Sequence, residues 1–146
     1  MNKTELVAAM AKDTNLSKKD VEAVLKSFID VVTDELKKGE KIQEIMTTLR
    51  QNPPAEFAGH KVTAVRDYKL DEITDLATGD KKPTGLPNSN VLYYELTDDA
   101  WVCVRPSGTE PKVKFYYGVK GTSLADADEK SDAMGKAVLE MVDSMK

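Results

Sequence analysis

The residues best suited to chemistry stand in one short segment, residues 105–112, with the sequence RPSGTEPK. Arg105 carries a planar guanidinium that can donate two parallel hydrogen bonds to an oxyanion, and Ser107 and Thr109 carry hydroxyl donors. Gly108 lets main-chain N–H groups come close to the same oxyanion. These residue types at this spacing predict a phosphate-binding loop. They predict a ligand class and not a reaction.

A plainer interpretation makes the same segment a hairpin turn with a surface arginine. Apolar runs at residues 101–104 and 113–119 flank it, as expected for two strands joined by a turn. Proline and glycine are common in turns whether or not the turn binds anything. Because eight contiguous residues combine donors, charge and prolines that fix the backbone, we favour the phosphate-binding interpretation.

The other reactive residue types are isolated. His60 has no recognisable nucleophile or orienting carboxylate beside it, so we expect a surface or turn histidine rather than a base. Asp126 and Asp128 are two positions apart, and on a helix such residues point in different directions, which argues against a metal site. Cys103 lies in an apolar strand and is expected to be a packed core thiol.

The composition narrows the class of protein. The 146-residue chain has a formal net charge of −4 and a pI near 5.1, so no global basic field favours nucleic acid or an anionic membrane. The single cysteine excludes an internal disulfide and fits a reducing compartment. No basic region leads into an apolar core at the start, and no apolar run approaches the roughly 20 residues that span a bilayer. We therefore expect a cytoplasmic protein.

Helices are predicted for the first third of the chain. Asn2 with Glu5, and Ser17 with Asp20, have the spacing of residues that cap a helix N-terminus. The first helix is short. The second should present a wide apolar face, because its apolar residues recur at helical spacing. These residues are Val21, Val24, Leu25, Phe28, Ile29, Val32 and Leu36.

Gly39 is expected to end this second helix, since glycine readily takes the left-handed conformation of a helix C-terminus. A third helix is expected over residues 42–51, before two prolines stop it. Alternating side chains then predict a strand over residues 62–67. Residues 70–90 are rich in turn formers and acidic groups, which predicts either a mobile or a functional loop, and we expect high mobility there.

Three further strands are predicted over residues 91–96, 101–104 and 113–119, joined as an antiparallel meander. Ser123 is expected to cap a final helix that covers one face of the sheet. The fold class is therefore α+β: an N-terminal helical pair followed by a small domain with an antiparallel sheet and covering helices.

The segment from residue 42 onward resembles the C-terminal domain of the α-D-phosphohexomutases, the phosphoglucomutase/phosphomannomutase family. The resemblance rests on residues 105–112, on the upstream sequence TGLPNSNVL at 84–92, and on FYYG at 115–118. It implies a TATA-binding-protein-like fold. It also implies that Arg105, Ser107, Gly108 and Thr109, with Lys112 more weakly, bind the phosphate that is not transferred.

Residues 1–41 resemble instead the two N-terminal helices of the bacterial histone-like protein HU. The matching segments are MNKTEL at 1–6, LSKKD at 16–20, FIDVV at 28–32 and LKKGEK at 36–41. In that family these helices form the core of a homodimer, while β-arms that follow them grip DNA, and here mutase-like sequence stands in place of the arms. Eight Lys against eight Asp or Glu through residue 41 leave no excess cation for a DNA duplex.

The leading hypothesis is a chimera of an HU-like dimerisation element, residues 1–41, and a phosphohexomutase C-terminal domain, residues 42–146, which binds phosphosugar or phosphate but does not catalyse by itself. The mutase family uses Mg²⁺, but the serine, aspartate-rich and glutamate-rich loops of a working mutase are not recognisable here, so no catalytic residue and no cofactor are assigned to this chain. Two alternatives remain: an HU-like nucleoid DNA-binding protein with an accessory mutase-like domain, and one component of a split phosphohexomutase.

Overall fold

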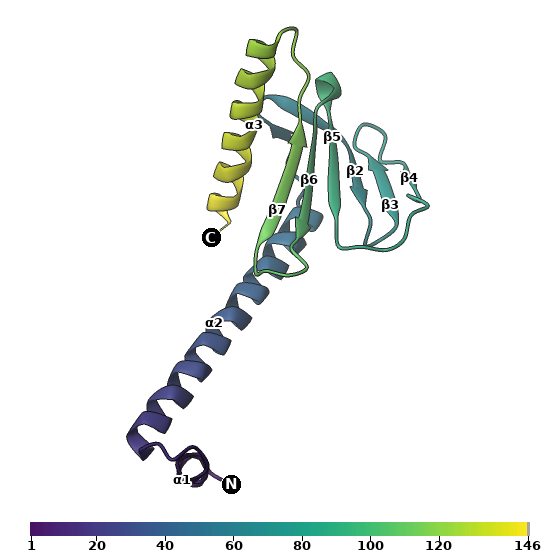
Figure 1. The fold of residues 1–146 in the computed structure, drawn as a ribbon. Helices are drawn as coiled ribbons and strands as arrows, with labels where there is room; N and C mark the ends of the chain where they lie inside the picture. The colour runs from purple at the N-terminus through teal and green to yellow at the C-terminus, as the bar shows by residue number, and fades with distance from the viewer. Residues whose placement is uncertain (146) are drawn as a thin grey trace. The chain divides into compact units, whose positions relative to one another are not determined.

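The computed structural model describes residues 1–145, whose helices and strands are shown in Figure 1. Within this range the chain forms three α-helices and a seven-stranded antiparallel sheet, so the predicted α+β class is confirmed. In chain order the elements are α1 (Lys3–Thr14), α2 (Lys18–Gln51), β1 (Glu56–Phe57), β2 (His60–Asp67), β3 (Glu72–Asp75), β4 (Lys81–Lys82), β5 (Leu92–Leu96), the 3₁₀-helix η1 (Thr97–Asp99), β6 (Trp101–Pro106), β7 (Val113–Gly118) and α3 (Leu124–Ser144).

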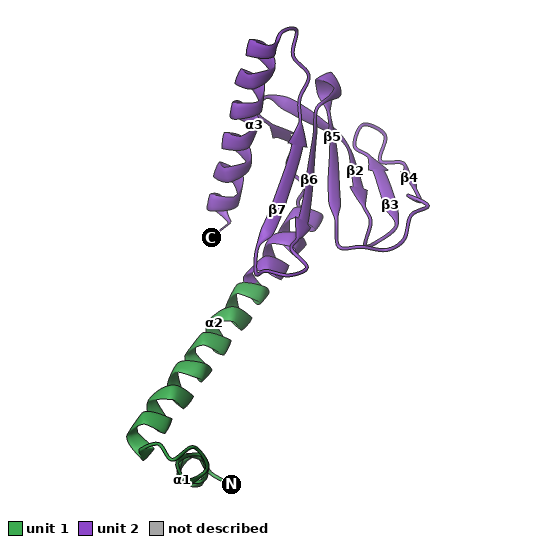
Figure 2. Ribbon diagram, viewed as in Figure 1, with its two compact units in different colours: residues 1–40 green, residues 41–146 purple. Residues whose placement is uncertain are grey.

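The chain divides into two compact units, residues 1–40 and residues 41–146 (Figure 2). In the first unit both predicted helix caps are confirmed. Asn2 Oδ1 accepts a hydrogen bond from the Glu5 amide at 2.9 Å, and the Glu5 carboxylate accepts one from the Asn2 amide at 3.1 Å. Ser17 Oγ accepts the Asp20 amide at 3.1 Å. These side chains satisfy amides that have no partner within the helix.

The first unit buries little apolar surface. Among its described residues, Val7 of α1 and Val21 of α2 are the buried hydrophobic side chains, 6% and 2% exposed. An ion pair at 3.1 Å between Lys3 and Glu22 also joins the two helices. The rest of the predicted apolar face is largely in solvent; we call it the α2 apolar face, with Val24, Phe28, Ile29, Val32 and Leu36 each 40% to 66% exposed.

The prediction that Gly39 ends a helix is wrong, because α2 is a single helix of 34 residues from Lys18 to Gln51. Gly39 does not have the positive φ that a glycine cap requires. A glycine inside a helix costs about 1 kcal/mol relative to alanine, and the lysines and glutamates on both sides of it are strong helix formers. None of the described helices is long and apolar enough to cross a membrane.

The strands of the second unit form one sheet in the order β4-β3-β2-β5-β6-β7, with β1 paired to β2 at one end. The predicted strand near residues 62–67 and the meander of three later strands are confirmed as β2 and β5 to β7. The segment 70–90, predicted as one long loop, contains β3 and β4. The sequence EITD of β3 holds one apolar residue and β4 has two lysines, so neither shows the alternation that predicts a strand.

One face of this sheet packs on α3 and on residues near the end of α2 to form the core. The core side chains are Ile45, Met46, Leu49, Phe57, Val62, Leu92, Tyr94, Leu96, Ala100, Val102, Val104, Met134 and Val138. The predicted cap of α3 is confirmed, since Ser123 Oγ accepts the Asp126 amide at 3.1 Å. Leu124, the first residue of α3, is 80% exposed.

Polar groups at the end of α2 are satisfied inside the second unit. Tyr94 donates a hydrogen bond to the carbonyl oxygen of Leu49 at 3.1 Å, at the end of α2 where carbonyls have no partner within the helix. Arg50 donates to Asp67 at 2.5 Å and to Asn90 at 3.0 Å. No buried side-chain nitrogen or oxygen among the described residues is left without a partner. These contacts fix the last turn of the helix on the sheet.

Candidate phosphate-binding loop

Residues 107–112 connect β6 to β7 at the tip of a hairpin. The last paired residues are Pro106 and Val113, and the amide of Ser107 donates to the carbonyl oxygen of Lys112 at 2.8 Å. The hairpin forms here because the flanking strands alternate apolar and polar side chains, while proline and glycine interrupt the alternation. The strands therefore hold all five predicted site residues within one hairpin end.

The hydroxyl of Ser107 lies inside this loop. Ser107 Oγ accepts hydrogen bonds from the amides of Thr109, at 3.5 Å, and Glu110, at 3.3 Å. The amide of Lys112 donates to the carbonyl oxygen of Glu110 at 2.8 Å. Two successive N–H groups thus point at one oxygen atom, an arrangement that turns also use to bind anions.

Arg105 lies on the face of β6 opposite the core. Side chains alternate along this strand, with Val102 and Val104 buried and Arg105 exposed. Arg105 Nη2 donates to the hydroxyl of Tyr116 at 3.3 Å, and the guanidinium carbon is 5.6 Å from the centroid of that ring. The hydrogen bond with Arg105 lowers the pKa of Tyr116 below its ordinary value and raises the pKa of Arg105. Among residues 1–145 Arg105 makes no ion pair, so no carboxylate neutralises it.

Lys112 and Gly108, also predicted as site residues, differ in their surroundings. Lys112 Nζ is 3.4 Å from the Glu110 carboxylate, and both side chains are solvent exposed. Gly108 has open space around it: a Cβ built there would meet no atom within 4 Å, and its φ is not in the left-handed range. The folded loop therefore does not require glycine at this position for packing or for backbone conformation.

His60, Asp126 and Cys103 are not assembled into a reactive site. His60 Nδ1 lies 3.0 Å from the Asp98 carboxylate, a partner 38 positions away that the sequence did not indicate. Asp126 binds Lys130 at 2.9 Å. Cys103 is half-buried on the face of β6 opposite the core, so the prediction of a core thiol is wrong, and burial raises the pKa of this thiol. The described residues contain no group of three His, Cys, Asp or Glu side chains arranged to hold a metal.

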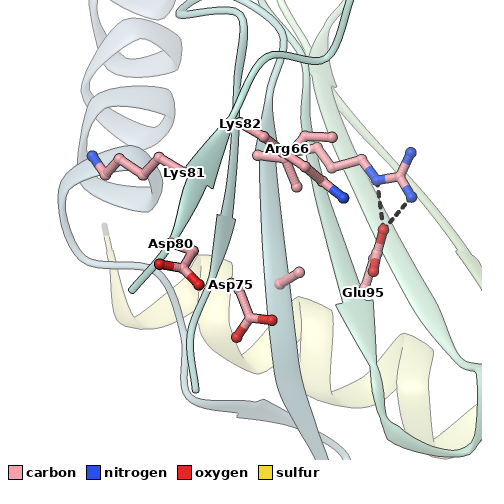
Figure 3. Close-up of a pocket in the computed structure, with 8 residues that line it drawn as sticks. Arg66, Asp75, Asp80, Lys81, Lys82 and Glu95 are labelled. Atoms are coloured by element: carbon pink, nitrogen blue, oxygen red, sulfur yellow. Dashed lines mark hydrogen bonds and ion pairs between the residues drawn. The ribbon is translucent and has the colours of Figure 1, made fainter. Parts of the chain in front are cut away.

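A second cluster of functional groups was not predicted. It lies on the sheet face opposite the core, which we call the open face. Arg66 on β2 donates to Glu95 on β5, with Nε 2.6 Å from Oε1 (Figure 3). The Arg66 guanidinium lies 5.4 Å from the centroid of the Tyr93 ring, which stacks on Trp101 at 5.5 Å and 11°. Alternation places each residue on this face, but the sequence does not reveal which strands are neighbours.

A hollow of about 350 Å³ lies beside the Arg66–Glu95 pair. Its charged lining comes from Arg66, Asp75, Asp80, Lys81, Lys82 and Glu95 (Figure 3). The hollow is open to solvent between β2, β3 and β4. Two of these strands belong to the segment predicted as a loop, so no strand pattern indicated that these residues meet.

Comparison with known proteins separates the two parts of the chain. Residues 1–49 match the family model described as Bacterial DNA-binding protein. The phosphoglucomutase of Staphylococcus aureus strain MSSA476 is 41% identical over 101 residues, which are 69% of this chain and 18% of that protein. The phosphoglucomutase of Staphylococcus aureus strain bovine RF122 / ET3-1 is 42% identical over 94 residues, 64% of this chain and 17% of that protein. No solved structure matches the chain.

Both resemblances predicted from the sequence are thereby confirmed. The family match ends at residue 49, within α2 and before the first strand. The chain spans less than a fifth of the length of the curated relatives that it matches.

Proposed function

We propose that this chain, which joins a helical segment of the bacterial DNA-binding protein family to a C-terminal domain of phosphohexomutase type, is a binding module for phosphorylated sugars. The β6–β7 loop would hold the phosphate group. The observation that carries the proposal is the convergence of two loop amides on Ser107 Oγ, in the same hairpin end as an arginine that has no carboxylate partner.

The amides of Thr109 and Glu110 would be the main-chain donors. They already point at one oxygen, so a phosphate oxygen near the Ser107 hydroxyl could receive them with little change in the loop. Ser107 could then turn its own O–H toward the phosphate, because a hydroxyl both donates and accepts. Such donors are placed before the ligand arrives, which lowers the entropic cost of binding.

Arg105 would supply the charge. Its present partner is the neutral hydroxyl of Tyr116, and a hydrogen bond to a phosphate oxyanion is roughly twice as strong as one between neutral groups. A phosphate would therefore compete well for the guanidinium. Lys112 has a weaker role in the proposal because its ammonium is shared with Glu110, which a phosphate would have to displace.

Gly108 supports a ligand at this loop. Since neither packing nor φ calls for glycine there, close approach of a phosphate to the main chain is the role that remains for it. Thr109 carries the second hydroxyl of the segment and lies exposed at the tip, where it can reach the same anion.

We do not extend the proposal to the interconversion of sugar phosphates. The relatives named phosphoglucomutase are more than five times as long as the matched segment, and phosphate binding is the part of their chemistry for which this chain has named residues. Conversion of glucose 1-phosphate by the purified chain would contradict the proposal of a binding module. Activity only after mixing with the remaining part of a phosphoglucomutase would favour the split-enzyme alternative.

We also propose that two copies associate through the α2 apolar face. Burying a large aliphatic or aromatic side chain contributes roughly 1.5 to 3 kcal/mol, so the exposure of Val24, Phe28, Ile29, Val32 and Leu36 has a high cost in water. A second copy would present the same apolar stripe, which is how a two-fold interface covers itself. The match to a bacterial DNA-binding family supports the same pairing.

The experiment that tests the phosphate site is a titration of the ¹⁵N-labelled chain followed by amide chemical shifts. Inorganic phosphate and glucose 1-phosphate should shift residues 105–110, and sodium chloride at equal ionic strength should not. The variant Arg105→Ala should lose the response while the spectrum elsewhere stays that of a folded protein. Shifts that persist in this variant, or that fall outside the hairpin, would show that the phosphate binds elsewhere.

DNA binding is the second candidate function, and the family match over residues 1–49 is the observation that favours it. The balance of eight Lys and eight Asp or Glu through residue 41 opposes it, because duplex binding needs uncompensated cations. A gel-shift assay with duplex DNA separates the two candidates. Binding that weakens steeply with added salt would support the DNA-binding function.

A further inference from the structure

The hollow on the open face has two parallel rows of charge of opposite sign. Across the strands, Arg66 lies opposite Ile73, and Ile73 lies opposite Lys82. In the next row on the same face, Ala64 lies opposite Asp75, whose amide donates to the carbonyl oxygen of Asp80 at 2.9 Å. The first row is therefore cationic at both ends and the second row ends in two carboxylates.

The distance between the rows follows from strand geometry. Residues two positions apart on a strand share a face and are separated by about 6.6 Å. Ile73 and Asp75 are such a pair on β3, and Ala64 and Arg66 are another on β2. Ile73 lies between Arg66 and Lys82 in the first row, and Ala64 lies between Glu95 and Asp75 in the second, so the middle of the hollow has an apolar floor.

The unneutralised charges in the hollow belong to Lys82 and to the two aspartates. Arg66 and Glu95 neutralise one another. Lys82 makes no ion pair among the described residues, and its ammonium points toward the Arg66 side chain (Figure 3). Asp75 accepts the turn amides of Ala77 and Thr78 with one oxygen, Oδ1.

Lys81 is excluded from the cationic row. It is opposite Thr74 in the register and therefore points to the other face of the sheet. Its ammonium lies 2.9 Å from the Glu72 carboxylate, and Figure 3 shows it directed away from Lys82. Both lysines therefore border the hollow, but the ammonium of Lys81 is directed away from it, to Glu72.

We propose that this hollow binds a small zwitterion whose oxyanion and ammonium groups are joined by an alkyl spacer, as in an ω-amino acid. The oxyanion lies against the Lys82 ammonium, beside the Arg66 guanidinium. The ammonium lies against Asp75 and Asp80, and the methylene groups cover Ile73 and Ala64. The volume of about 350 Å³ is near the lower limit for small-molecule sites and admits a ligand of this size.

A ligand with one charge fits this arrangement less well. A simple anion at Lys82 would leave the carboxylate row without a partner and would feel its repulsion. A simple amine at the aspartates would meet the same problem at the cationic row. A zwitterion has a charge complementary to each row, whereas a simple anion or a simple amine complements only one of them. The site lies on β2 to β4 and does not depend on the proposed phosphate function of the β6–β7 loop.

The test uses the full-length ¹⁵N-labelled chain with 6-aminohexanoate as the probe. We expect saturable shifts of amides in residues 73–82 and a much weaker response to hexanoate or hexylamine, each of which carries one of the two charges. The shorter 4-aminobutyrate should bind less well, because it does not span the rows. Equal binding of hexanoate, or no response to 6-aminohexanoate at saturating concentration, overturns the proposal.

Variants at the two lysines provide the matched control. Lys82→Gln should raise the Kd for 6-aminohexanoate about threefold, the size of effect expected when an exposed charge pair is lost, and Lys82→Arg should restore binding. Lys81→Gln makes the same change one residue away and should leave the Kd unchanged. Equal effects of the two glutamine variants would indicate a general loss of positive charge and overturn the assignment to Lys82.

Discussion

Arg105 and Tyr116 face one another across β6 and β7, with Nη2 of the arginine 3.3 Å from the hydroxyl of the tyrosine. The two residues are on the same sheet face, and the guanidinium also lies over the aromatic ring. The hydrogen bond favours the ionised phenol, and for this reason the pKa of Tyr116 falls below its ordinary value of 10. This contact holds the arginine of the proposed phosphate site before any ligand arrives.

We predict that Arg105→Ala raises the pKa of Tyr116 back toward 10. The alanine removes both the hydrogen bond and the positive charge that stabilise the phenolate. Titration of tyrosine ultraviolet absorbance between pH 8 and about 12 measures the change. The variant Arg105→Lys keeps the charge but not the planar donor and should give an intermediate value. An unchanged titration curve in the alanine variant would mean that Arg105 is not bonded to Tyr116 in solution.

Tyr116→Phe should leave phosphate binding intact or slightly stronger, because it frees the guanidinium from a competing acceptor. This variant separates the role of Arg105 as a phosphate donor from its contact with Tyr116. Amide shifts of residues 105–110 under phosphate titration report the result. Loss of the response in the phenylalanine variant would show that the tyrosine itself is part of the site.

Two glycines near the hairpin should respond differently to alanine. A Cβ at Gly118 would come within 2.4 Å of Trp101 Nε1, so the indole would have to move. Gly118→Ala should reduce the free energy of unfolding by about 1 to 3 kcal/mol, the usual cost of overpacking. Gly108→Ala meets no atom within 4 Å and should change stability by less than about 0.5 kcal/mol while weakening phosphate binding. Urea unfolding measures both, and equal destabilisation by the two alanines would contradict the prediction.

Tyr94→Phe should destabilise the second unit. The Tyr94 hydroxyl bonds the carbonyl oxygen of Leu49, and its loss leaves that buried acceptor without this donor. We expect a loss of about 1 to 3 kcal/mol in the free energy of unfolding, typical for a buried group left unsatisfied. Tyr68→Phe, which removes a hydroxyl from a less buried position, is the control. Equal stability of wild type and Tyr94→Phe in urea would mean that water replaces the bond.

Asp71 should make stability depend on pH. Its carboxylate accepts hydrogen bonds from the Thr84 hydroxyl at 2.5 Å and from the amides of Thr84 and Gly85, and the hydroxyl contact contributes most to lowering the pKa of Asp71. A lowered folded-state pKa means that this stability is fully present above the unfolded value of 3.8 and is lost as pH falls through the folded-state value. The urea midpoint of Asp71→Asn should therefore fall less steeply below pH 4. Parallel curves would contradict the prediction.

Association through the α2 apolar face is tested by one substitution on this face and a control substitution on the opposite side of the helix. Phe28→Asp places a charge in the middle of this face and should shift the chain from twice its 16.1 kDa mass to the monomer mass in light scattering. Ala23→Asp adds the same charge on the opposite side of the helix, since five residues advance about 500° around it. The control should remain dimeric. A monomeric wild type at all concentrations would contradict the proposal.

Local patterns predicted much of the fold because they depend on nearby residues alone. The capping pairs Asn2–Glu5 and Ser17–Asp20 are three positions apart, and the alternation of β5 to β7 has a period of two. The prediction at Gly39 failed because the residues around a glycine that ends a helix can be the same as those around a glycine inside one. The difference is set by whether the helix beyond it gains packing, and Met46 and Leu49 are fully buried.

The two candidate sites differ in whether their residues are close together in the sequence. The residues of the β6–β7 loop are contiguous, so their types could be read together, whereas the partner of Arg105 lies on the next strand. The hollow at Arg66 and Lys82 joins residues 16 positions apart through two short strands. Neither β3 nor β4 carries a strand pattern, because their side chains are polar and partly in solvent. Such a site depends on register and becomes visible only in three dimensions.

Trp101, the single tryptophan of the chain, stacks on Tyr93 beside Arg66. Its fluorescence therefore reports on the sheet alone, while far-ultraviolet circular dichroism is dominated by helix, much of it in the first 40 residues. Melting curves recorded with both signals would coincide if the two units unfold together and would separate if each unfolds by itself. One built-in fluorophore thus allows the cooperativity of the joined segments to be measured without any label.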